Sequence, residues 1–155
     1  MEPTNTNTNT NELLTQPLSH YKDIQPFIPN ISSGRVIKVY DGDTITIIAQ
    51  LNYPDCPLYK FNVRLDNIDC PEIKTKDPIE KQVAQIAKKT LNDLIFDKVI
   101  TLKNVKTEKY GRLLATIYLD ELNINEYLVE KRLAYVYDGG TKTKPTNWLE
   151  YYEGK

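Results

Sequence analysis

The part of the chain that decides the fold is the sequence FNVRLDNIDCPE, at residues 61–72. Apolar and polar residues alternate in it as far as Leu65. This period of two is typical of a strand with one buried face, so the side chain of Arg64 is expected to point away from the core. Pro71 has no backbone N–H and restricts the residue before it to extended geometry, which predicts a rigid turn after the strand.

Asp69 and Glu72 both lie in this turn, downstream of Arg64. Two carboxylates held together on a rigid turn repel each other unless a cation balances them, and carboxylate oxygens are ligands that Ca²⁺ prefers. The same residues would also be ordinary in a solvated turn beside a surface arginine. This segment alone leaves both interpretations open, and two further segments favour the first.

The 155 residues suffice for one domain with a core, and a formal net charge of −1 excludes neither nucleic acid nor any other partner. The charge is unevenly distributed. Residues 71–112 contain ten Lys or Arg and six Asp or Glu, an excess of four positive charges beside the carboxylate turn. A solvated helix face with ordinary lysines would give the same excess, so the composition does not decide between the two.

Residues 1–30 are predicted to form a disordered or loosely packed polar tail, because Asn and Thr alternate in this segment and several prolines interrupt it. The folded domain is expected to extend over residues 33–155. The only histidine, His20, lies in the tail. We therefore expect neither a histidine-based catalytic site nor a zinc site.

The two cysteines, Cys56 and Cys70, do not make a disulfide framework, which favours a reducing compartment. The N-terminus lacks the basic and apolar regions of a signal peptide, and no stretch has the length and apolar character of a membrane span. We expect an intracellular, cytoplasmic monomer with no signal peptide and no membrane contact.

A hairpin is predicted before the strand that contains Arg64. Two runs rich in Val and Ile, at residues 36–39 and 45–48, flank the sequence YDGDT at residues 40–44, and Asp-Gly between such runs is a strong hairpin signal. The turn explains the Asp-Gly pair. It does not explain Asp43, which begins the second strand, where aspartate is disfavoured. The spacing of acidic residues does not fit an EF-hand.

A helix is predicted after the carboxylate turn, with Asp77 as N-cap, Pro78 in the first turn, Glu80 at the capping-box position and an apolar stripe to about Phe96. The remaining predicted elements are strands at residues 99–105 and 113–119 and a short helix that ends near residue 132. Five strands, one helix after the third of them and a second short helix predict an α+β fold. An OB-type Greek-key barrel matches this order best.

Asp43, Arg64, Asp69 and Glu72, together with Arg112 directly before the predicted strand at residues 113–119, suggest one chemistry. Asp43 and Asp69 can offer hard oxygen ligands to calcium, and Glu72 can act as general base on a water molecule. Arg64 and Arg112 can each contact a phosphate through two N–H groups. A metal, a base and two guanidinium groups are what phosphodiester hydrolysis needs, because negative charge develops on the phosphoryl oxygens in its transition state.

Three motifs in this order resemble the staphylococcal nuclease (thermonuclease) family. They are DGDT at residues 41–44, the strand and turn from Arg64 to Glu72, and KYGR at residues 109–112. The resemblance extends from about residue 33 to about residue 137, and the family domain is an OB-type barrel. By this resemblance the calcium ligands are Asp43, Asp69 and the main-chain carbonyl of Cys70, the catalytic residues are Arg64, Glu72 and Arg112, and the substrate contacts are Lys109 and Tyr110.

The resemblance implies a hydrolase, a calcium-dependent endonuclease that cleaves DNA, RNA or both and leaves 3′-phosphates. Cys70 stands where the family commonly has Thr, and a main-chain ligand should tolerate this change. The closing C-terminal helix of the family is expected to be shortened or replaced after Asp138. The chain is also less basic than secreted members, which predicts weaker and more salt-sensitive nucleic-acid binding.

Two other functions fit parts of the sequence. The first alternative is a non-catalytic barrel that binds nucleic acid or protein, but scaffold copies in related multidomain proteins typically lack the glutamate, the arginines or the aspartates, and all five are present here. The second is a structural calcium-binding domain, which leaves Arg64 and Arg112 unexplained. A plasmid cleavage assay with and without calcium distinguishes the three.

Overall fold

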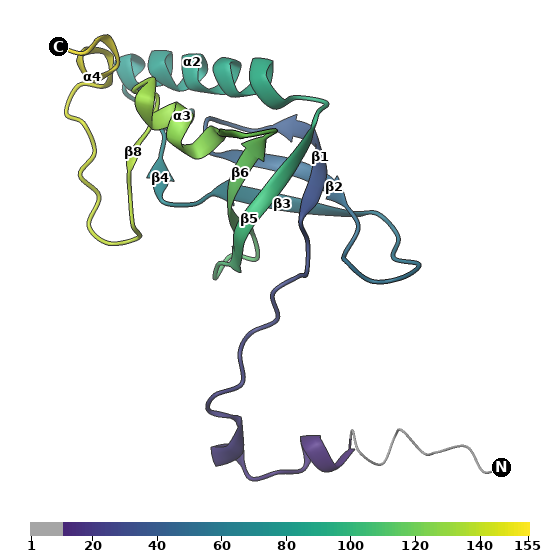
Figure 1. The fold of residues 1–155 in the computed structure, drawn as a ribbon. Coiled ribbons are helices and arrows are strands. Elements are labelled where there is room, and N and C mark those ends of the chain that lie inside the picture. Colours follow the sequence, from purple (N-terminus) through teal and green to yellow (C-terminus); the bar gives the residue numbers. More distant parts are fainter. Residues whose placement is uncertain (1–10) are drawn as a thin grey trace.

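The computed structural model describes residues 11–155. A closed barrel forms its centre (Figure 1). The barrel strands are β1 (Ser33–Val39), β2 (Thr44–Ala49), β3 (Tyr59–Leu65), β5 (Val99–Thr107) and β6 (Leu113–Leu119). Their order is β3-β2-β1-β5-β6, and a parallel pairing of β3 with β6 closes the sheet on itself. The predicted α+β fold with an OB-type barrel is confirmed.

The alternation in residues 61–65 has the predicted consequence. Val63 and Leu65 are fully buried inside the barrel, whereas Arg64 lies on the outer face opposite Thr44 of β2. The β1–β2 pairing contains a bulge between Val36 and Lys38. A bulge lets two residues on one strand oppose one residue on its partner. After it, Lys38 is paired with Thr46 on the outer face.

Three helices lie on one side of the molecule, and the last of them packs against the first (Figure 1). They are α2 (Pro78–Ile95), α3 (Ile124–Glu130) and α4 (Trp148–Glu153). Asp77 caps α2 by accepting a hydrogen bond from the backbone N–H of Ile79, and Val83, Ala87 and Leu91 bury the apolar stripe in the core, as predicted. No helix among the described residues is long and apolar enough to cross a bilayer.

The C-terminal segment packs back onto the domain. Trp148 is buried at the start of α4, with its ring centroid 5.8 Å from that of Tyr135 and 5.6 Å from that of Tyr151. Tyr135 belongs to the short strand β8 (Tyr135–Val136), which pairs with β4 (Ile68–Asp69) directly after β3. The aromatic contact therefore brings the chain after Asp138 close to the carboxylate turn.

Two of the minor elements are the strand β7 (Leu122–Asn123), which pairs with β6, and the 3-10 helix η1 (Leu18–Tyr21). Within the predicted tail, residues 1–10 lie outside the described residues. Residues 11–30 extend away from the barrel and bury no side chain in its core (Figure 1). The first core residue along the described chain is Ile31.

Candidate active site

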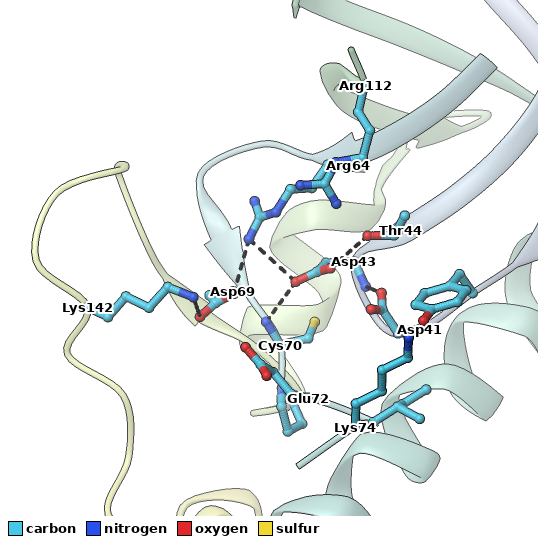
Figure 2. A pocket seen from close by; sticks show the side chains of 13 residues that line it. Asp41, Asp43, Thr44, Arg64, Asp69, Cys70, Glu72, Lys74, Arg112 and Lys142 are labelled. Carbon is cyan, nitrogen blue, oxygen red and sulfur yellow. Dashed lines mark hydrogen bonds and ion pairs between the residues drawn. The ribbon is translucent and has the colours of Figure 1, made fainter. Parts of the chain in front are cut away.

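Arg64 is the centre of the candidate site. One of its guanidinium nitrogens lies 3.0 Å from Oδ1 of Asp69 and 3.6 Å from Oδ2 of Asp43, so it contacts carboxylates from two different turns (Figure 2). The other terminal nitrogen donates to the carbonyl of Leu65. The barrel pairing of β2 with β3 therefore brings together the two aspartates that the sequence predicts as a pair.

Asp43 is almost fully buried, with 7% of its surface exposed. Its carboxylate accepts hydrogen bonds from the backbone N–H of Cys70 at 3.0 Å and from the Thr44 hydroxyl at 3.1 Å. Burial, together with the nearby charge of Asp41, raises the pKa of Asp43 to about 7, and the attraction of Arg64 only partly opposes this. The positive charge around the Asp43 carboxylate therefore does not fully compensate for its burial and for the charge of Asp41.

Asp69 is also buried, but it has more donors around it. Besides Arg64, it accepts a hydrogen bond from the Tyr135 hydroxyl at 2.8 Å. It also lies 3.1 Å from the ammonium group of Lys142 (Figure 2). Burial and the bond to Asp69 both raise the pKa of the Tyr135 hydroxyl, which remains a hydrogen-bond donor at neutral pH. The C-terminal segment thus contributes two partners to Asp69.

Glycine in the DGDT motif has a packing role. A Cβ atom at Gly42 would lie 2.9 Å from both the Sγ of Cys70 and the Cβ of Ala87, closer than real contacts allow. The turn with Asp43 and the turn with Cys70 can approach each other only because this position has no side chain. The Cys70 thiol faces this contact, and burial raises its pKa, so it is a neutral core group here.

Glu72 lies at the exposed edge of the pocket, and its carboxylate points toward the space beside Asp69 and Cys70 (Figure 2). Its backbone N–H donates to Oε2 of Glu80 at 2.9 Å. Glu80 is only 2% exposed and also forms an ion pair with Lys144 from the C-terminal segment. A buried carboxylate on α2 thus fixes the main chain of the candidate base.

The capping box expected at Glu80 does not form. In that motif, Glu80 would bond the backbone N–H of Asp77. The Thr75 hydroxyl accepts this N–H instead, at 3.2 Å. Glu80 reaches past its own helix end to Glu72, so its role depends on the path of the loop and not on the helix pattern.

Arg112 comes from the KYGR motif after β5. Gly111 has a φ of +84°, which glycine adopts without penalty, and this turn brings Arg112 back to Glu108. The Arg112 guanidinium donates to both Glu108 oxygens, at 2.7 and 3.1 Å. This bond lowers the pKa of Glu108 and raises that of Arg112, so both remain charged. The sequence reasoning missed Glu108. The only local signal for this pair is that Glu108 lies four residues before Arg112.

One pocket of about 300 Å³ joins the predicted site residues. Its lining includes Asp43, Arg64, Asp69, Cys70, Glu72 and Arg112. The predicted substrate contacts lie in an adjoining hollow that Arg64 and Arg112 also line, where Lys109 lies over the exposed ring of Tyr110 at 4.9 Å. The structure therefore brings all of these residues into two adjacent hollows.

The comparison with protein families agrees with this arrangement. The model of the family described as "Staphylococcal nuclease homologue" matches residues 62–154, more than half of the chain. The chain belongs to the staphylococcal nuclease family. The match contains Arg64, Asp69, Glu72 and Arg112 but begins after Asp43. The inclusion of Asp43 in the candidate site of this staphylococcal nuclease domain is therefore based on its contacts with Arg64 and Cys70.

Several curated proteins resemble this nuclease-family chain. An uncharacterized endonuclease of Haemophilus influenzae is 35% identical over 103 residues, which are 66% of this chain and 51% of the relative. Endonuclease YncB of Bacillus subtilis is 32% identical over 137 residues, 84% of this chain and 60% of the relative. The SPbeta prophage-derived endonuclease YokF of the same species is 32% identical over 111 residues, 68% of this chain and 35% of the relative. The matched part is thus between half and three fifths of the first two relatives.

The donors in this nuclease-family site fit a hard cation. Among residues 11–155 there is no cluster of three His, Cys, Asp or Glu side chains that could hold a metal ion. The two carboxylates that meet at Arg64 are those of Asp43 and Asp69. Both offer oxygen, and the main chain at Cys70 adjoins them. Few oxygen ligands with room for water suit calcium or magnesium and disfavour zinc or copper.

Proposed function

We propose that this chain is a calcium-dependent nuclease that hydrolyses phosphodiester bonds of DNA, RNA or both. The observation that carries the proposal is the contact of one Arg64 guanidinium with two buried carboxylates, in a pocket that Glu72 and Arg112 also line. Membership of a nuclease family and relatives named endonucleases support it.

The two arginines hold the scissile phosphate in this proposal. Arg112 is anchored by Glu108, so its guanidinium keeps one orientation, and Arg64 is anchored by Asp69 and the Leu65 carbonyl. Planar guanidinium groups make paired hydrogen bonds to phosphate oxygens, which a lysine cannot copy. Fixed cations of this kind stabilise the charge that develops on the phosphoryl oxygens.

Glu72 takes the proton of the attacking water. Its carboxylate is exposed to solvent at the pocket edge, while its backbone is fixed by Glu80. Asp43, Asp69 and the carbonyl of Cys70 would hold the calcium ion. When bound, calcium supplies positive charge beside the phosphate and balances the buried carboxylates. Lys109 and Tyr110 contact the substrate beyond Arg112.

The test replaces the base and keeps the volume. Glu72→Gln should slow cleavage of plasmid DNA in calcium by about 100-fold or more, because a general base contributes at least this much. Substrate binding should remain. Glu121→Gln, at an exposed position in the turn between β6 and β7, is the matched control and should cleave normally. Binding without cleavage by the unmodified protein would favour the non-catalytic barrel instead.

A further inference from the structure

An exposed tyrosine with two lysines near its ring borders the active-site pocket and also lines a hollow that does not contain Lys109 or Tyr110. Tyr40 follows β1 and is 40% exposed. The ammonium nitrogen of Lys38 lies 5.8 Å from the centre of its ring, and that of Lys74 lies 6.0 Å from it. The two lysines come from different parts of the chain, β1 and the loop after Pro71. The cluster is therefore a product of the fold.

This cluster is continuous with the catalytic pocket. Tyr40 and Lys74 line the pocket that contains Arg64, and Figure 2 shows Lys74 beside Asp41 at its edge. Tyr40 and Lys38 line a further hollow of about 300 Å³ on the outer face of β1, β2 and β3. Arg112 borders that hollow as well. A polynucleotide strand bound at Arg112 can therefore continue over Tyr40.

The floor of the hollow carries polar groups in a row. Lys38, Thr46 and Asn62 are cross-strand neighbours, since Thr46 is paired with both of the others. The Thr46 hydroxyl donates to Oδ1 of Asn62 at 2.9 Å, and the amide N–H groups of Asn62 have no partner among the described residues. An amide donor beside an ammonium group suits phosphate, sugar or base oxygens.

The hollow with Lys109 and Tyr110 and the hollow with Tyr40 have only Arg112 in common. Each hollow contains one exposed tyrosine with lysine over or beside its ring. Proteins that bind single strands combine aromatic rings, on which bases stack, with basic groups that follow the backbone. This combination is present in two hollows that share Arg112.

We propose that Tyr40, Lys38 and Lys74 form a nucleotide subsite for single-stranded nucleic acid on the far side of Arg112. A base stacks on the Tyr40 ring, and the two ammonium groups contact phosphates of the same strand. The subsite rests on the proposed function, because Arg112 is taken to hold the scissile phosphate. The substrate is then a polynucleotide strand that extends in both directions from the cleaved bond.

The test measures binding separately from cleavage. The probe is a fluorescein-labelled oligothymidylate of about 12 nucleotides, a length within the site sizes of OB folds. Anisotropy titrations use the Glu72→Gln background so that the probe stays intact. Tyr40→Ala should raise Kd by about five-fold or more, the loss that one base–aromatic stack gives, and Tyr40→Phe should stay within about two-fold because the ring remains. Tyr59→Ala, with 44% of the tyrosine exposed on β3, is the matched control.

Two further measurements distinguish the loss of base stacking from a general loss of folded protein. Lys38→Ala and Lys74→Ala should each flatten the dependence of log Kd on log salt concentration by about 0.7, the value for one phosphate contact on a single strand. The Tyr40→Ala effect should be smaller on a blunt duplex of the same length, whose bases are not free to stack.

An unchanged Kd in Tyr40→Ala would overturn the subsite, as would an equal loss on single strand and duplex. If the unmodified protein cleaves plasmid DNA and Tyr40→Ala binds the oligothymidylate normally, only the subsite is wrong. If the unmodified protein does not cleave plasmid DNA and yet Tyr40→Ala binds the oligothymidylate five-fold more weakly, only the catalytic proposal is wrong.

Discussion

Replacing Asp43 with asparagine should stabilise the metal-free protein while it removes the candidate metal ligand. In the folded protein the pKa of Asp43 is raised to about 7 from an ordinary value of 3.8. Between these values the folded state keeps a proton that the unfolded state has lost. Stability therefore falls as the pH rises from about 4 to about 7 and remains lower above that range. The amide side chain of the Asp43→Asn variant is neutral throughout, and its oxygen can still accept the Cys70 N–H.

The size of the effect follows from the shift. A shift of about three pKa units, at about 1.36 kcal/mol per unit, sets an upper limit of about 4 kcal/mol at pH above about 7. Asp43 is only 7% exposed, so solvent screening reduces this little. An amide does not reproduce every contact of a protonated carboxyl group, so a gain of about 2–4 kcal/mol is expected. At about 2–4 °C per kcal/mol for a protein of this size, this is about 4–16 °C in Tm.

Thermal unfolding in excess chelator, followed by circular dichroism at pH about 8 and about 4.5, measures the gain at both ends of the titration. Asp55→Asn is the matched control, because Asp55 is exposed and its replacement should leave Tm unchanged. A Tm for Asp43→Asn at the higher pH that is equal to or below that of the unmodified protein would refute the reasoning. So would a gain of equal size at both pH values.

Three further outcomes are expected. Glu80→Ala removes the acceptor of the Glu72 N–H and should lower kcat about ten-fold or more, with partial rescue in Glu80→Gln, which keeps an acceptor. Equal kcat for the unmodified protein and both variants in steady-state kinetics would contradict this positioning role. Lys142→Ala removes a cation 3.1 Å from Asp69 and should lower the calcium concentration for half-maximal cleavage by up to about five-fold. An increase in that calcium concentration would contradict this prediction. Deleting residues 1–22 should change Tm by no more than about 2 °C in a scanning measurement, because residues 11–22 bury nothing in the core; a large decrease would show that the segment stabilises the domain.

The sequence carried enough information to predict the barrel and the positions of the main candidate site residues in it. The period of two in residues 61–65 placed Arg64 on the outer face, because alternation in a strand depends only on backbone geometry. The DGDT and KYGR motifs placed Asp43 and Arg112 at strand ends. Pairing of adjacent strands then brought them to one pocket.

The partners of these residues were not predictable in the same way. Glu80 matched a local capping pattern, and only the three-dimensional path of the loop shows that it bonds Glu72. Lys142 and Lys144 follow Asp138, in a stretch without periodicity. Their positions depend on the burial of Trp148, a contact between segments that no local pattern encodes.

The most direct test of the proposed metal-dependent hydrolysis is the initial rate of cleavage of a single-stranded oligonucleotide in calcium, in magnesium and in excess chelator. The unmodified protein is predicted to cleave in calcium, far more slowly in magnesium and not at all in chelator, while its circular dichroism spectrum remains that of the folded domain. Asp69→Ala is predicted to be inactive in calcium. Full activity in excess chelator would contradict the assignment of Asp43 and Asp69 to a metal and, with it, the proposed mechanism.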